Sequence, residues 1–237
     1  IMTDVMSLPS AFTLDNIKNV FHDMKYPATF LNTLIATVIG TLGIIVIASM
    51  GGYKMARVKT RYSRFCFLFC IAPMIIPFQS FMLTLVNVAT TLHINGKIWG
   101  LAIIYWGLGA PMSIFLYQGF AKGIPLELEE SALIDGCNQF QLFTRIIFPM
   151  LKSCTATVTI INVMWIWNDF LLPLLMLGGR KSSKTLQLAA YSFMGQYKME
   201  WQNIMSAAIL IIIPALILYL IFQKSIIKGV VAGAVKG

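Results

Sequence analysis

Charged residues are scarce in this sequence, and acidic residues are scarcer than basic ones. Only 11% of the 237 residues are charged and 58% are hydrophobic, whereas a soluble domain is about 25% charged and about 45–50% apolar. Together with a mean hydropathy of +0.78, this composition excludes an ordinary soluble domain and predicts an all-α polytopic membrane protein. The net charge of +9 therefore concerns membrane topology first, and the sequence contains no motif for binding nucleic acid.

Several motifs of catalysis and metal binding are also missing. The sequence has no phosphate-binding loop of the form GxxxxGK[ST], and the run GGRKSS at 178–183 lacks its spacing. The four cysteines have neither metal-site nor disulfide spacing, and the apolar runs contain no nucleophile–base pair or metal cluster. We therefore expect no enzyme activity, no ATP hydrolysis and no metal or cofactor in this chain.

Five apolar runs are long enough to cross a bilayer, which takes about 20 residues. We place them at 29–50, 65–86, 99–121, 154–177 and 203–223. They form a transmembrane domain over 29–223, between an N-terminal segment at 1–28 and a C-terminal tail at 224–237. A short capped helix is expected near residues 13–21. Pro73 and Pro77 lie inside the second run and can kink it.

The connector after the first apolar run indicates the orientation. It carries five cations and no acidic residue: Lys54, Arg57, Lys59, Arg61 and Arg64. Because loops rich in Lys and Arg stay on the cytoplasmic side, alternation places the N-terminal segment and the loops at 87–98 and 178–202 outside. The segment 124–149 and the C-terminus then lie inside. Arg180, Lys181 and Lys184 in the loop at 178–202 oppose this orientation, but the connector is the sharper signal.

The segment 124–149 is neither a span nor a plain loop. Pro125 suits the first position of a helix, which we expect to run from Leu126 to Asp135 with acidic residues near its positive end. Gly136 can then adopt a left-handed conformation and turn the chain, and Asn138 can cap a second helix. That helix carries one apolar stripe, made of Phe140, Phe143 and Ile147. From the residues alone, an interfacial linker between two spans explains this helix-turn-helix equally well.

Motifs in this segment resemble the EAA loop of permeases from binding-protein-dependent ABC importers. The family pattern is EAA, a nearby Gly and then I-x-L-P. The matching residues are Glu130, Ser131, Ala132, Asp135, Gly136, Ile146 and Pro149. Ser131 replaces the middle Ala, Cys137 the Ala that usually follows the Gly, and Phe148 the Leu. The resemblance implies that this loop is a cytoplasmic coupling helix that docks on a separate ATPase subunit.

Other stretches resemble the carbohydrate subgroup of these permeases, the maltose and multiple-sugar (MalG-like) family. They are WNDFLLPLLML at 167–177, TLQLAAYSFMGQY at 185–197 and the tail KGVVAGAVKG at 228–237, so that the similarity extends over nearly the whole chain from Leu31. The resemblance implies that the tail reaches into the ATPase dimer. The tail residues concerned are Gly233, Val235, Lys236 and Gly237. It also implies a sixth, first span before residue 1, although a cleaved signal is an alternative.

The fourth apolar run is unusual because it contains polar side chains. An ionised Asp in hydrocarbon costs about 2.5–3.5 kcal/mol on insertion scales, so Asp169 should face water or the bundle interior, or lie at the headgroup level. The functional hypothesis is a translocation path, where aromatic faces and amides suit the alternating CH and OH groups of a sugar. Its candidate residues are Asn162, Trp165, Asn168 and Asp169.

The resemblance completes the functional hypothesis. It implies a multi-pass subunit of a bacterial or archaeal cell (inner) membrane that takes up oligosaccharides. Its partners are a second homologous permease, two ATP-binding subunits that hold ATP and Mg, an extracytoplasmic sugar-binding protein and membrane lipid. An ABC importer for a non-sugar solute is one alternative. Another is a secondary active transporter, which needs intramembrane acid or His relays, and here only Asp169 could serve.

Overall fold

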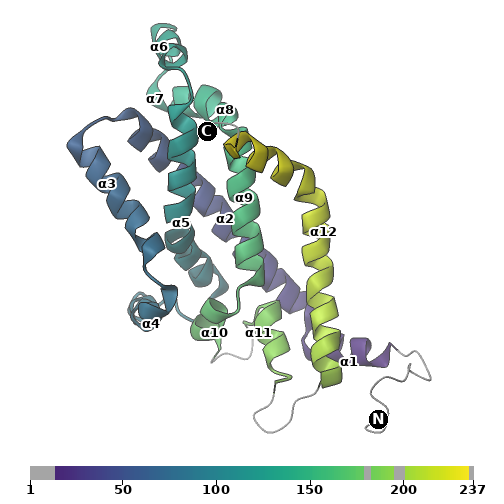
Figure 1. Ribbon diagram of the computed structural model, residues 1–237. Helices are drawn as coiled ribbons and strands as arrows, with labels where there is room; N and C mark the ends of the chain where they lie inside the picture. Colours follow the sequence, from purple (N-terminus) through teal and green to yellow (C-terminus); the bar gives the residue numbers. More distant parts are fainter. Residues whose placement is uncertain (1–13, 179–182, 195–200, 235–237) are drawn as a thin grey trace.

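The computed structural model describes residues 14–178, 183–194 and 201–234. All the secondary-structure elements in these ranges are helices (Figure 1). The first elements are α1 (Asp15–Asp23), α2 (Tyr26–Arg57), α3 (Arg61–Ile71), η1 (Ala72–Ile75), η2 (Phe78–Ser80), α4 (Met82–Thr91) and α5 (Ile98–Lys122). They are followed by α6 (Leu126–Ile134), α7 (Gln139–Gln141), η3 (Leu142–Ile147), α8 (Phe148–Met150), α9 (Lys152–Asn168), α10 (Leu171–Leu177), α11 (Leu186–Tyr191) and α12 (Trp201–Ala234). The chain is an all-α polytopic membrane protein, as its composition predicts.

Two long helices, α2 and α5, form the centre of the bundle and pack along each other. Small residues allow their close approach: a Cβ on Gly43 would lie 2.0 Å from Nε1 of Trp106, and one on Gly52 would lie 2.7 Å from Cβ of Tyr117. The Trp106 indole fills the space above Gly43 and donates a hydrogen bond to the carbonyl of Ile39 at 2.9 Å. Helix α9 packs beside this pair, and α12 packs on α9 (Figure 1).

Not every expected span is one straight helix. Among the described residues, α2 and α5 are long and apolar enough to cross a membrane, and a third span results if the segment 139–150 is joined to α9 across a bend of 75°. The expected run at 29–50 lies in α2 and the run at 99–121 coincides with α5, where Pro111 does not interrupt the helix. The expected run at 203–223 lies in α12, which extends to Ala234.

The run at 65–86 is divided into α3, two 3-10 turns and α4. Pro73 and Pro77 cannot donate backbone hydrogen bonds and their rings obstruct the preceding turn, and the helix stops where they occur. The run at 154–177 is divided as well, because Asp169 is extended (φ −71°, ψ 133°) between α9 and α10. We expected Pro73 and Pro77 to kink the second run, and the helix is interrupted there instead. No break was expected at Asp169.

The two ends of the bundle differ. Helices α6, α7 and α8 lie at one end, whereas α1, α10 and α11 lie at the other (Figure 1). Helix α1, expected near residues 13–21, covers Asp15–Asp23, and its Val20 is buried in a second apolar cluster with Trp167 and Leu186. Of the tail residues singled out above, Gly233 lies in α12, while Val235, Lys236 and Gly237 lie outside the described residues.

Candidate functional site

Helix α6 and the turn after it have the geometry that their residues predict. Helix α6 starts at Leu126, with Pro125 at its N-cap rather than at the expected first helical position, and ends at Ile134, one residue before the expected Asp135. Gly136 has φ +85°, a conformation that a side chain disfavours. Asn138 then forms a capping box: its Oδ1 accepts from the backbone N–H of Gln141 at 2.9 Å, and Oε1 of Gln141 accepts from the N–H of Asn138 at 3.0 Å.

The second helix of the pair differs from our prediction of a single α-helix with one apolar stripe. After the single turn of α7, residues 142–147 form a π-helix, which widens the turn and changes the direction of the following side chains. Phe140 is 68% exposed, whereas Ile147 is fully buried. Phe143 packs against the Tyr53 ring at 5.7 Å between centroids. The stripe is thus split between the surface and the core.

A buried carboxylate attaches α6 to the end of α2. Glu129 is only 8% exposed. Its Oε1 lies 2.6 Å from Nε of Arg57, and its Oε2 accepts a hydrogen bond from the hydroxyl of Tyr53 at 2.8 Å. Arg57 also donates through Nη2 to the carbonyl of Ile124 at 2.9 Å. Because a buried charge is tolerated only when it is paired and hydrogen-bonded, these three side chains fix the base of α6.

Sequence reasoning missed this cluster. It assigned Glu129 only to the acidic start of a helix and Arg57 only to a basic connector. The separation of 72 residues between the two leaves no local pattern to detect. The one available signal is composition, since Arg57 lies at the end of an apolar run and three glutamates lie in a chain that has few.

The residues expected in the EAA loop divide into exposed and inward-facing ones. Glu130, Ser131, Asp135, Gly136 and Pro149 are exposed, Ala132 is buried, and Ile146 packs against the core. The Ser131 hydroxyl donates to the Glu127 carbonyl at 2.8 Å, so its contact is within α6. Glu130 forms no ion pair with the described residues, unlike its neighbour Glu129.

The outer surface of this helix pair is strongly apolar. Five large hydrophobic side chains on or near α6 are exposed: Leu126 by 48%, Leu128 by 42%, Leu133 by 43%, Ile134 by 86% and Phe140 by 68%. We call them the α6 surface. Exposed apolar patches beside acidic residues are typical of protein interfaces, and this one lies at the tip of the bundle (Figure 1).

The polar residues of the fourth run do not lie together. Asn162 is buried in the core and donates to Oγ of Ser113 at 3.1 Å and to the Val158 carbonyl at 2.8 Å. Asn168 is exposed and donates to the Met164 carbonyl at 2.8 Å. Both make the hydrogen bonds expected of structural polar residues in a helix bundle.

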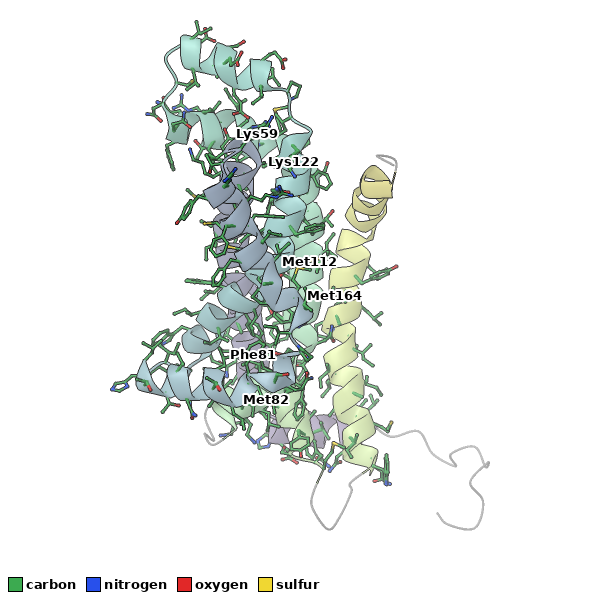
Figure 2. The ribbon with its side chains drawn as sticks, turned by 60° about the vertical axis from the view of Figure 1, so that its left-hand side comes forward. Lys59, Phe81, Met82, Met112, Lys122 and Met164 are labelled. Carbon is green, nitrogen blue, oxygen red and sulfur yellow. The ribbon has the colours of Figure 1, made fainter. Side chains whose placement is uncertain are left out.

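Trp165 and Asp169, in contrast, line one cavity. It has a volume of about 390 Å³ and is lined also by Gln79, Phe81, Pro111 and Met112. Oδ2 of Asp169 accepts from the Tyr105 hydroxyl at 2.7 Å, and its Oδ1 accepts from the Leu171 N–H at 3.1 Å. The cavity therefore lies between α5 and the two places where apolar runs are interrupted, at residues 72–81 and at Asp169. Figure 2 shows Phe81 and Met112, which contribute from two of these segments.

Within the described residues there is no group of three or more His, Cys, Asp or Glu side chains that could hold a metal ion. The four cysteines are free thiols.

Comparison with known proteins identifies a family. The family described as "Binding-protein-dependent transport system inner membrane component" matches residues 43–231. The chain is 39% identical over 236 residues to the "Probable starch degradation products transport system permease protein AmyC" of Thermoanaerobacterium thermosulfurigenes, with 100% of this chain and 85% of the relative covered. It is 38% identical over 239 residues to the "Multiple sugar-binding transport system permease protein MsmG" of Streptococcus mutans, with 100% and 86% covered.

A solved structure shares the fold. It is described as a bacterial ABC transporter involved in the import of the acidic polysaccharide alginate, and its chain matches with a TM-score of 0.77 at 22% identity, covering 93% of this chain and 82% of that one.

Proposed function

The chain belongs to the family of binding-protein-dependent transport system inner membrane components, and we propose that it is the permease subunit of an ABC importer for oligosaccharides. The names of its relatives, which refer to starch degradation products and multiple sugars, support a sugar as the solute. A second homologous permease would complete the path. Two ATP-binding subunits would hold ATP and Mg, and an extracytoplasmic protein would deliver the sugar.

The observation that carries this proposal is the α6 surface. Five large apolar side chains are exposed at the tip of the bundle, beside the exposed Glu130, and their burial against a partner would remove apolar area from water. An ATP-binding subunit that covers this surface would also meet the carboxylate of Glu130, for which a charge-assisted contact is suitable.

The attachment of α6 to α2 gives a route for coupling. Glu129, Arg57 and Tyr53 connect the base of α6 to the end of a helix that runs the length of the bundle. A displacement of α6 by the ATP-binding subunits would therefore move α2, and with it α5, as a rigid body. Such a movement would switch the permease pair between its inward and outward openings.

The orientation follows from the basic connector. Lys59 lies at the end of the bundle that carries α6 (Figure 2), and by the positive-inside rule this end would be cytoplasmic. The N-terminal helix α1 would then lie outside and the C-terminus inside. A membrane-impermeant thiol reagent should modify Cys137 in inverted vesicles but not in intact cells. Modification of Cys137 from outside would contradict this orientation and the docking of an ATPase on α6.

The cavity at Trp165 and Asp169 is the part of the translocation path that this chain would supply. An aromatic edge, a carboxylate and the Gln79 amide line it, and these groups can bind hydroxyls and the apolar face of a sugar ring. Asn162 and Asn168, whose side-chain amides donate hydrogen bonds within the bundle, do not line this cavity.

The experiment is a comparison of Ile134→Ser with Leu14→Ser in the complete importer. Both residues are exposed hydrophobics, at 86% and 51%, at opposite ends of the molecule. If Ile134 is buried by an ATP-binding subunit, its loss should weaken retention of that subunit roughly 10- to 100-fold, from about 1.5–3 kcal/mol for a buried aliphatic side chain. Leu14→Ser should have no effect. Unchanged co-purification of the ATP-binding subunit with Ile134→Ser would contradict the proposal.

A further inference from the structure

A second, larger cavity lies at the same end of the bundle as α6; it shares Leu126 with the α6 surface and no residue with the cavity at Trp165 and Asp169. Its volume is about 1030 Å³, and it is an open cavity lined by the connector from α2 to α3, the first turns of α3 and the segment from α5 to α6. The lining comprises residues 55–61, 63, 64, 67 and 68 on one side and 118, 122 and 124–127 on the other.

The polar part of this lining is cationic. Five lining residues carry a positive charge, and Glu127 is the one lining carboxylate: the cations are Arg57, Lys59, Arg61, Arg64 and Lys122. Arg57 is neutralised by Glu129. The other four form no ion pair with any described residue. Figure 2 shows Lys59 and Lys122 close to each other near α6, on two different segments of the chain. Four cations around one cavity with a single lining carboxylate, Glu127, repel one another, and a bound anion would reduce this repulsion.

The rest of the lining and its surroundings are apolar. Val58, Phe67 and Leu68 line the cavity, and the outer surface of α3 continues with exposed aromatic rings, Phe65 at 65% and Phe69 at 70%. Cationic groups therefore lie directly beside a long apolar surface. Long Lys and Arg side chains reach the membrane–water boundary from such positions. A small anion dissolved in water would gain nothing from the apolar half, whereas a lipid would bind to both halves.

We propose that this cavity binds the phosphodiester head group of an anionic phospholipid, with the acyl chains along the apolar surface of α3. The phosphate would be held by Arg61, Arg64 and Lys122, and Lys59 would add to the positive field. This assignment rests on the proposed orientation, which places the cavity at the cytoplasmic leaflet, where anionic lipids attract basic pockets between spans.

The test is native mass spectrometry of the complete purified importer in detergent, titrated with short-chain phosphatidylglycerol, with phosphatidylcholine of the same chain length, or with inorganic phosphate. The wild type should retain phosphatidylglycerol more tightly than phosphatidylcholine. In R61Q/R64Q/K122Q one phosphatidylglycerol site should weaken on the order of 100-fold, since each cation near a membrane surface contributes roughly fivefold. The matched control K152Q removes an exposed cation at the start of α9, outside the cavity, and should bind like the wild type.

Three results would overturn the proposal: equal retention of the two lipids, wild-type binding by the triple variant, or displacement of phosphatidylglycerol by an equal concentration of inorganic phosphate, which would indicate a site for a soluble anion. Should the triple variant fail to assemble, R61K/R64K provides a second test, because it keeps the charges and should retain the lipid. In addition, binding of phosphatidylglycerol to the wild type should weaken as salt rises from 50 to 500 mM, because salt screens the attraction between the cations and the phosphate. Salt-independent binding would contradict it. Retention of the ATP-binding subunits is recorded in the same spectra, so that loss of the lipid and loss of coupling are distinguished.

Discussion

The carboxylates of Glu129 and Asp169 each connect a short helix to one of the two long helices, and they do so through different partners. Glu129 joins α6 to α2 through a cation and a hydroxyl. Asp169 joins the start of α10 to α5 through the Tyr105 hydroxyl and a backbone N–H, with no cation within salt-bridge distance among the described residues. In the first arrangement both carboxylate oxygens have a side-chain partner, one of them cationic. The second leaves a carboxylate available in a cavity.

Under the proposed function, this difference would distinguish the region that transmits force from the region that meets the solute. A buried ion pair fixes geometry but offers no free group to a ligand. A carboxylate held by neutral donors keeps acceptor capacity for the hydroxyls of a bound molecule. The proposed coupling end and the proposed path are thus distinguished by whether the carboxylate has a cationic partner.

The largest effect is expected from Arg57→Met, which leaves Glu129 buried without its cation. Removal of one partner of a buried pair costs about 3–5 kcal/mol, so the free energy of unfolding of the purified subunit should fall by about this amount. Denaturant unfolding of the variant measures the loss. In the control Arg57→Met/Glu129→Met no charge is left unpaired, and most of the stability should return. A single variant as stable as the wild type would show that the pair does not hold α6.

The second effect in size concerns Tyr105→Phe, which removes the hydroxyl donor to Asp169. A hydrogen bond to a charged group contributes about 1.5–3 kcal/mol, and its loss should free the carboxylate and reduce sugar uptake. The matched control is Tyr117→Phe on the same helix, whose hydroxyl donates to the neutral Thr155 Oγ1 at 2.9 Å and contributes about 0.5–1.5 kcal/mol. Equal uptake by the two variants would remove the distinction between Asp169 and an ordinary structural contact.

The smallest effect is expected from Gly136→Ala. A Cβ at Gly136 or at Gly119 meets nothing within 4 Å, but only Gly136 has a positive φ. Alanine should therefore strain the turn after α6 by about 1–2 kcal/mol, while Gly119→Ala in α5 should be neutral or stabilising by up to about 1 kcal/mol. Solute-stimulated ATP hydrolysis by the importer should fall for the first variant alone. If both variants hydrolyse ATP alike, the turn does not set the position of α6.

Local chemistry made part of this structure predictable. The start of α6 follows from Pro125, the turn after it from Gly136 and the cap of α7 from Asn138. Each of these rules involves only neighbouring residues, and the structure shows the helix start, the turn and the cap at these positions. The two prolines at 73 and 77 indicated a kink, but whether a proline kinks or interrupts a helix depends on its neighbours. Pro111 lies within α5 without a break.

What could not be predicted depends on contacts between distant segments. The pairing of Glu129 with Arg57 and that of Tyr105 with Asp169 join residues 72 and 64 positions apart. No local pattern distinguishes Glu129 from Glu130, yet the first is buried and the second exposed. The π-helix at 142–147 was not predicted either; Ile147 at its end is buried, whereas Phe140, which precedes it, is exposed.

The central claim is that α6 is the contact to an ATP-binding subunit, and site-specific photo-crosslinking in membranes tests it most directly. A photoreactive amino acid replaces Ile134, the most exposed residue of the α6 surface at 86%, in cells that express the complete importer, and Leu14 serves as the control position. We expect a covalent product between position 134 and the ATP-binding subunit and none from position 14. Products of position 134 with lipid or with the second permease, and none with the ATP-binding subunit, would contradict it.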